Sequence, residues 1–197
     1  MILANTIALV LCGGTSTRMG SDKSMLQYYD KPQRYHVYDM LQPFAQQVFI
    51  SCNAGQANTI EAGYQSLTDL TMYAHTGPMA ALLTAFTRFP QKSILMIGCD
   101  YPFLSVSELI NFSTCCTDAP ISFYNNEKEL YDPLLAWYPA TASETIQEMH
   151  AAAHFSLQEF LQESRAAKYY PANKHCSTSV DTPEEFKRSK KLITGVY

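Results

Sequence analysis

The sequence lacks the features that mark several large classes of protein. Its six cysteines form no CxxC pair, the spacing typical of structural zinc sites and redox-active dithiols. The opening run MILANTIALVL has no basic leader and ends before Gly13, too short to cross a bilayer. No repeat, low-complexity stretch or linker occurs. We therefore expect a cytoplasmic protein with reduced cysteines, no targeting segment and no membrane partner.

Positive charge is also scarce. The formal net charge of -4 argues against a nucleic-acid partner, because non-specific affinity for nucleic acid comes mainly from lysine and arginine. The balance is reversed locally over residues 1–34, which carry Arg18, Lys23, Lys31 and Arg34 against Asp22 and Asp30. Such a segment attracts an anionic small molecule.

The fold prediction follows from alternating patterns over a chain whose length suits a single domain, residues 1–197. Strands are predicted over residues 6–12, 47–52, 70–74, 94–99, 120–125, 133–138 and 167–170. Helices are predicted after Pro32 and Pro78, and after the Ser/Thr-x-x-Glu capping signatures that begin at Ser105, Thr141, Ser156 and Thr182. This alternation predicts the α/β class: a three-layer domain with an open, mostly parallel sheet and helices on both faces. A hairpin tip predicted at residues 125–129 makes a small part antiparallel.

Residues 11–24, LCGGTSTRMGSDKS, follow the first predicted strand as a glycine-rich, cationic loop. A Walker pattern is excluded because Gly20 precedes serine rather than lysine, and G-x-G-x-x-G does not occur. The backbone amides of Gly13 and Gly14, with the charges of Arg18 and Lys23, suit a polyphosphate. Glycine loops without a ligand are common in proteins, so that alternative stays open at this point.

Asp100 directly follows the buried-strand pattern of residues 94–99. In open parallel sheets ligands bind at the carboxyl ends of strands, where the loop after the first strand also lies. A hard cation such as Mg²⁺ that bridges this carboxylate to phosphate oxygens would offset its desolvation. The alternative is a helix cap or a turn residue before Pro102.

Together these residues resemble a known family. Residues 11–23 resemble the L-A-G-G-x-S-x-R-M-G-x-D-K signature of the molybdenum cofactor guanylyltransferases, a MobA-like family in the Rossmann-like nucleotidyltransferase superfamily. The resemblance continues in order along the chain through Lys31-Pro32, His36, Gly77-Pro78-Met79-Ala80, Cys99-Asp100-Tyr101-Pro102, Asp132-Pro133-Leu134 and Asp181-Thr182-Pro183-Glu184. It implies a Rossmann-like nucleotidyltransferase fold.

The activity that the resemblance implies is transfer of GMP from GTP to the terminal phosphate of molybdopterin, with release of pyrophosphate. Arg18 and Lys23 would hold the triphosphate, and Asp100 would bind Mg²⁺. These are the implied catalytic residues, since phosphoryl-type transfer depends mainly on positioning and charge neutralisation. Proteins that deliver or accept molybdopterin are the implied protein partners.

The resemblance also implies nucleotide-binding residues along the chain. Backbone groups of Leu11, Cys12 and Gly13 would contact the nucleotide, and Gly14 would shape the turn. The paired glycines favour a guanylyl donor, since cytidylyl relatives tend to carry alanine-glycine there.

Later positions complete the implied site. Gly77 and Pro78 would border the base and ribose. Ser51 stands where many relatives have asparagine, with Asn53 two positions on. Asp181 occupies the place of an asparagine near the metal and the acceptor.

The sequence departs from the family pattern in other places. Residues 73–76 lack the aspartate that relatives use for the nucleotide, Cys12 replaces alanine, and Asp132 stands where histidine is frequent. Three alternatives therefore remain: a cytidylyltransferase, a guanylyltransferase for another phosphorylated acceptor, and a nucleotide-binding protein without catalysis. His150 and His154 have metal-binding spacing without an acidic partner, so a solvated helix face is expected there.

Overall fold

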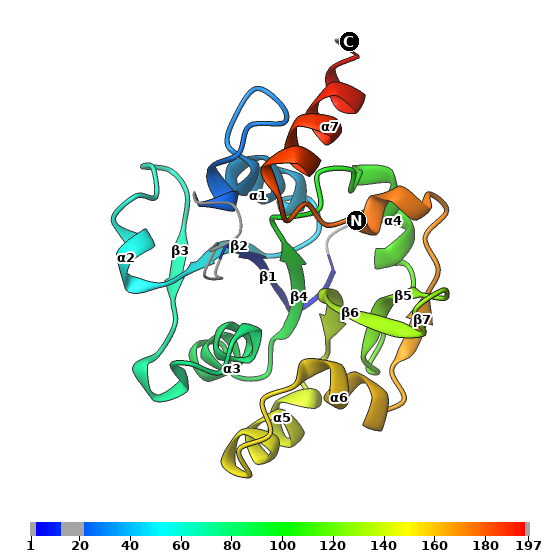
Figure 1. Cartoon of the computed structure of the whole chain (residues 1–197). Coiled ribbons are helices and arrows are strands. Elements are labelled where there is room, and N and C mark those ends of the chain that lie inside the picture. The colour runs from blue at the N-terminus through cyan, green and yellow to red at the C-terminus, as the bar shows by residue number, and fades with distance from the viewer. Residues whose placement is uncertain (1–2, 13–21, 196–197) are drawn as a thin grey trace.

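A single seven-stranded sheet runs through the protein in the order β3-β2-β1-β4-β6-β5-β7. The computed structural model describes residues 3–12 and 22–195 (Figure 1). The strands are β1 (Thr6–Leu11), β2 (Gln47–Cys52), β3 (Ser66–Thr68), β4 (Ser93–Gly98), β5 (Ile121–Asn125), β6 (Leu130–Tyr138) and β7 (Ala167–Tyr169). Strands β3, β2, β1 and β4 run parallel, and β6 is antiparallel to both of its neighbours. The predicted hairpin between β5 and β6 is confirmed.

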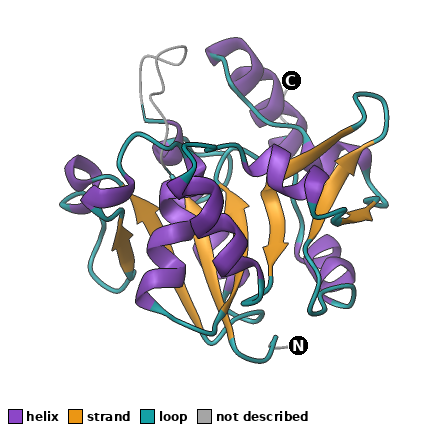
Figure 2. Cartoon of the chain, turned by 90° about the horizontal axis from the view of Figure 1, so that it is seen from below, coloured by secondary structure: helices purple, strands orange, loops and turns teal. Residues whose placement is uncertain are grey.

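Helices cover both faces of this sheet. They are α1 (Gln33–Leu41), α2 (Ala54–Ala57), α3 (Pro78–Arg88), α4 (Val106–Ser113), α5 (Ala142–Ala151), α6 (Leu157–Glu163) and α7 (Pro183–Thr194). Helices α1 and α4 pack on one face, and α3, α5 and α6 on the other (Figures 1 and 2). The predicted three-layer, mostly parallel α/β fold is therefore confirmed. No described helix has the length and apolar character needed to span a membrane.

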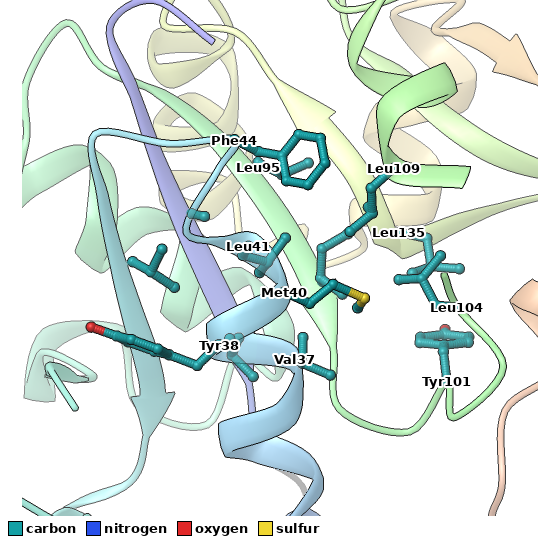
Figure 3. Close-up of a cluster of buried hydrophobic side chains, with 14 of the residues drawn as sticks. Val37, Tyr38, Met40, Leu41, Phe44, Leu95, Tyr101, Leu104, Leu109 and Leu135 are labelled. Atoms are coloured by element: carbon teal, nitrogen blue, oxygen red, sulfur yellow. The ribbon is translucent and has the colours of Figure 1, made fainter. Parts of the chain in front are cut away.

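Successive side chains along a strand point to opposite faces of the sheet, and they form one apolar core on each face. On β4, Leu95 faces the α1 and α4 side, where it joins Leu41 and Leu109 (Figure 3), whereas Met96 faces the opposite core. Burial of each such side chain contributes about 1.5–3 kcal/mol. Because both faces are apolar, β4 reads as a continuous hydrophobic run, as central strands of parallel sheets do.

The capping signatures are confirmed at three helices and differ at one. Thr182 forms a complete capping box with Glu185 at the start of α7. Ser105 and Ser156 accept from the backbone N–H three residues on. Thr141 instead has helical backbone angles, and its hydroxyl donates to the carbonyl of Asp118.

The strand predicted over residues 70–74 is wrong. The strand next to β2 is Ser66–Thr68, and residues Thr71–Tyr73 form a 3₁₀ helix. Pairing ends there because β2 itself ends at Cys52, whose carbonyl accepts the last bond from Asp69 N. The next free amide, Leu70 N, donates to the hydroxyl of Thr84 at 2.9 Å.

Candidate functional site

Strands β1, β2 and β4 end side by side at one edge of the sheet. Leu11 pairs with Ser51 of β2 on one side and with Gly98 of β4 on the other. Backbone bonds extend this register by one residue, from Cys12 N to Ser51 O and from Cys99 N to Leu11 O, both 3.1 Å. The segments that follow these strands therefore leave from the same edge, where open α/β sheets bind ligands.

A cavity of about 580 Å³ lies at this edge. Its lining includes five residues that the sequence singled out: Leu11, Ser51, Asn53, Gly77 and Pro78. Gly77 precedes α3 with φ 61° and ψ -141°, a conformation that residues with a side chain rarely adopt. Pro78 then begins the helix, where its missing N–H costs no intrahelical bond.

Asp69 is a site residue that the sequence analysis missed. It lines the same cavity, and its carboxylate accepts a hydrogen bond from the Ser51 hydroxyl at 3.4 Å. Burial raises the pKa of this carboxyl above its usual value, against the opposing effect of the Ser51 bond. The misplaced strand concealed it: with β3 at its true position, Asp69 directly follows the strand, as Asp100 almost directly follows β4. The cavity thus contains a carboxylate, although residues 73–76 have none.

A charged cluster lies beside the end of β4. Lys23, in the short 3₁₀ helix Lys23–Met25, forms an ion pair with Asp181, which lies just before α7. Val180 N donates to the carbonyl of Asp100 at 3.0 Å and so brings this segment to β4. Burial raises the pKa of Asp100, Lys23 opposes this shift, and Asp181 adds to it.

Close packing fixes the end of β4 and connects it to β6. A Cβ built on Gly98 would lie 2.6 Å from the Asp100 carboxylate and 2.9 Å from the Tyr101 ring, so glycine leaves the space that these two side chains occupy. The hydroxyl of Tyr101 donates to Asp132 at 2.8 Å. Burial raises the pKa of Asp132 to about 6.

Asp100 and Asp181 are the groups that fit a divalent cation. Both present carboxylate oxygens, and Mg²⁺ is commonly held by one or two carboxylates together with substrate phosphates. A cation would relieve the mutual repulsion and the desolvation that raise the pKa of Asp100. Among residues 3–12 and 22–195, no group of three or more His, Cys, Asp and Glu side chains gathers as a metal site. Substrate oxygens would therefore have to complete the coordination.

The remaining predicted residues are placed as follows. Gly13, Gly14 and Arg18 lie outside the described residues. Cys12 is buried, and its N–H is used by the sheet. The His150 ring packs edge-on against the Tyr73 ring, with 5.1 Å between the ring centroids, while His154 is exposed.

Comparison with known proteins places the chain in a family. The sequence model of the MobA-like NTP transferase domain matches residues 8–168. A molybdenum cofactor guanylyltransferase of Shewanella loihica is 26% identical over 94% of this chain and 96% of that protein. A molybdenum cofactor biosynthesis bifunctional protein of Synechocystis is 27% identical over 90% of this chain, which spans only 52% of that protein.

Solved structures show the same fold. Molybdopterin-guanine dinucleotide biosynthesis protein A from Archaeoglobus fulgidus superposes with a TM-score of 0.73 at 21% identity and covers 97% of this chain and 100% of that one. Rv0371c of Mycobacterium tuberculosis gives a TM-score of 0.70 at 16% identity, over 98% of this chain and 100% of that one. With the family match over most of its length, the chain belongs to the MobA-like NTP transferases and is a nucleotidyltransferase.

Proposed function

We propose that the enzyme transfers GMP from GTP to the terminal phosphate of molybdopterin, with Mg²⁺, to form the guanine dinucleotide cofactor and pyrophosphate. One observation carries the proposal: a cavity lined by Asp69 near the ends of β1 and β2, and a lysine-carboxylate cluster beside the end of β4, lie along the same edge of the sheet. The cavity suits a nucleoside, and the cluster suits its phosphates and a cation. The names of the relatives, molybdenum cofactor guanylyltransferases, support this donor and this acceptor.

Each half of the site has its own task. Asp69 would accept hydrogen bonds from ribose hydroxyls or from the N–H groups of guanine, since an ionised carboxylate only accepts. Gly77 and Pro78 would form the wall against the base and ribose, and the backbone of Leu11 would lie along the nucleotide. Lys23 would turn from Asp181 toward the triphosphate, where its charge offsets the charge on the phosphates.

Asp100 and Asp181 would hold Mg²⁺, which supplies charge neutralisation for the phosphates. A triphosphate that extends from the cavity along this edge would then meet two negative side chains and one positive side chain. The acceptor is already an anionic phosphate, so the protein needs no strong general base. Positioning and electrostatic stabilisation are the expected sources of rate.

The test is turnover with purified protein, Mg²⁺ and molybdopterin, with GTP, CTP, ATP or UTP supplied separately and pyrophosphate measured. We expect release with GTP that depends on both the acceptor and Mg²⁺. Equal turnover of CTP and GTP would remove the guanine assignment. Pyrophosphate release from GTP in the presence of another phosphorylated acceptor, but not in the presence of molybdopterin, would remove the assignment of molybdopterin as the acceptor.

The argument for a nucleotide-binding protein without catalysis is weaker once the cavity is described. It depended on the missing acidic residue near positions 74–76, and Asp69 now provides a carboxylate in the cavity. A reducing cytoplasm remains the proposed compartment, and proteins that deliver or accept molybdopterin remain proposed partners.

A further inference from the structure

The side chain of Gln56, on the short helix α2, connects three segments of the candidate site. Its Nε2 donates to the carbonyl of Cys12 at 3.3 Å and to Oδ2 of Asp22 at 2.9 Å. Its Oε1 accepts from Asn53 N at 3.2 Å. Both amide N–H bonds and the amide carbonyl are therefore used. A flipped amide would place donors against a donor and its carbonyl against two acceptors, so the orientation is fixed.

The bond to Asp22 reaches Lys23 through one further step. The other oxygen of Asp22, Oδ1, accepts from the backbone N–H and the hydroxyl of Ser24, at 2.9 and 2.7 Å. These bonds cap the 3₁₀ helix that begins with Lys23. Gln56 thus holds the carboxylate that starts the helix carrying the proposed phosphate-binding lysine.

Helix α2 is itself anchored to the body of the protein. The fully buried guanidinium of Arg34, on α1, donates to the Thr59 hydroxyl at 3.1 Å and to the Thr59 carbonyl at 2.5 Å. The Thr59 hydroxyl in turn donates to the backbone carbonyl of Gln56 at 2.7 Å. Gln56 therefore projects from a fixed support, which a lone surface glutamine would lack.

We propose that Gln56 is a positioning residue that fixes Lys23 relative to the end of β1, so that the lysine faces the phosphates of the bound nucleotide. This role rests on the proposed nucleotidyl transfer. Gln56 is not among the described residues that line the cavity, so it acts through Asp22 and the 3₁₀ helix without touching the substrate. Its neighbours on α2 have no comparable reach, because Ala54, Gly55 and Ala57 carry no polar side chain.

Replacing the hydrogen-bond donors of Gln56 with acceptors tests the proposal. Gln56→Glu replaces both N–H donors with a carboxylate that faces the Cys12 carbonyl and Asp22. We expect kcat to fall about ten- to a hundredfold, the size of a lost hydrogen bond to a charged group, with less change in the KM for GTP. Gln46→Glu is the matched control. The Gln46 side chain accepts from Lys92 near the opposite end of β2, so activity should stay unchanged in that variant.

Asp22→Asn supplies the diagnostic partner. Its Oδ1 still accepts from Ser24, and its new Nδ2 can donate to the carboxylate introduced by Gln56→Glu but opposes the Nε2 of the wild-type Gln56. The substitution should therefore lower activity in the wild-type background and raise it at least about threefold in Gln56→Glu. Neighbouring residues that interact directly show such non-additivity, and general destabilisation does not reverse sign.

Amide hydrogen exchange in residues 22–26 separates this proposal from the proposed function. The amides of Ser24, Met25 and Leu26 are hydrogen bonded to acceptors within the protein, so exchange can be followed even if no acceptor is turned over. We expect faster exchange in Gln56→Glu and recovery in the double variant. Unchanged exchange in Gln56→Glu, or an equal loss from Asp22→Asn in both backgrounds, would overturn the role. Absence of GTP turnover in the wild type with these exchange changes intact would overturn only the transfer reaction.

Discussion

The two halves of the sheet build the same edge in opposite ways. In the half formed by β3, β2, β1 and β4, all strands run parallel, so their carboxyl ends meet and leave a cavity and a charged cluster. In the half formed by β6, β5 and β7, strand β6 runs the other way and brings its beginning to that edge. There Asp132 is bonded to Tyr101. In the proposed function, the parallel half would present groups to the nucleotide, and the antiparallel half would hold the end of β4 through the Tyr101–Asp132 bond.

The largest effect expected from this difference is at Asp100. In Asp100→Asn the shape is kept and the charge is lost, and we expect turnover to fall roughly a hundredfold or more. Thermal stability at pH 8 should hold or rise, because burial makes the ionised carboxylate unfavourable in the folded protein. A collapse of the melting temperature with turnover intact would assign Asp100 to support instead.

Lys23 allows the halves to be compared with a matched pair. Lys23→Ala removes a cation that pairs with Asp181 at the site, and we expect kcat/KM to fall about ten- to a hundredfold. Lys174→Ala breaks the exposed pair with Glu127 in the antiparallel half and should change the rate less than about twofold. Steady-state pyrophosphate release at constant ionic strength measures both. Equal losses of kcat/KM in the two variants would contradict the different roles given to the two halves of the sheet.

Gly77 separates backbone strain from a role in the cavity. Gly77→Ala and Gly63→Ala both place a side chain at positive φ, and each should lower stability by about 1–3 kcal/mol. Gly77 lines the cavity and Gly63 does not, so Gly77→Ala should also raise the KM for GTP severalfold. Denaturant unfolding and kinetics of both proteins provide the measurement. A raised KM in Gly63→Ala as well would remove the argument for the cavity.

Asp132 gives the smallest expected effect and belongs to the supporting half. Its pKa of about 6 lies above the usual value of 3.8, so the unfolded chain releases the proton first as pH rises. The free energy of unfolding of the wild-type protein therefore falls as pH rises from 3.8 to about 6, and it stays lower above pH 6. In Asp132→Asn, which keeps the acceptor for Tyr101, stability should be higher by about 1–2 kcal/mol at pH 8, the half-buried carboxyl being partly screened by solvent. The gain should vanish near pH 4 in a series of melts. A gain independent of pH would contradict the assignment to this carboxyl.

Sequence patterns predicted the fold well where periodicity and strand ends agree. Strands β1, β2 and β4, and the placement of Asp100 after β4, follow from buried apolar runs with clear ends. The pattern failed at β3, since the apolar and β-branched residues after Thr68 continue past the point where β2 can pair. That error concealed Asp69. Side-chain bridges such as Gln56 to Asp22 have no local signal, because they join residues 34 positions apart.

The ion pair between Lys23 and Asp181 has a consequence for biosynthesis. Its partners lie 158 residues apart, so the ribosome makes the lysine early and the carboxylate late. A nascent chain that has emerged as far as β7 holds every described strand of the sheet but not yet Asp181, the ion-pair partner of Lys23. Anions in the surrounding solution, nucleoside triphosphates among them, would then meet Lys23 before its ion-pair partner has been made.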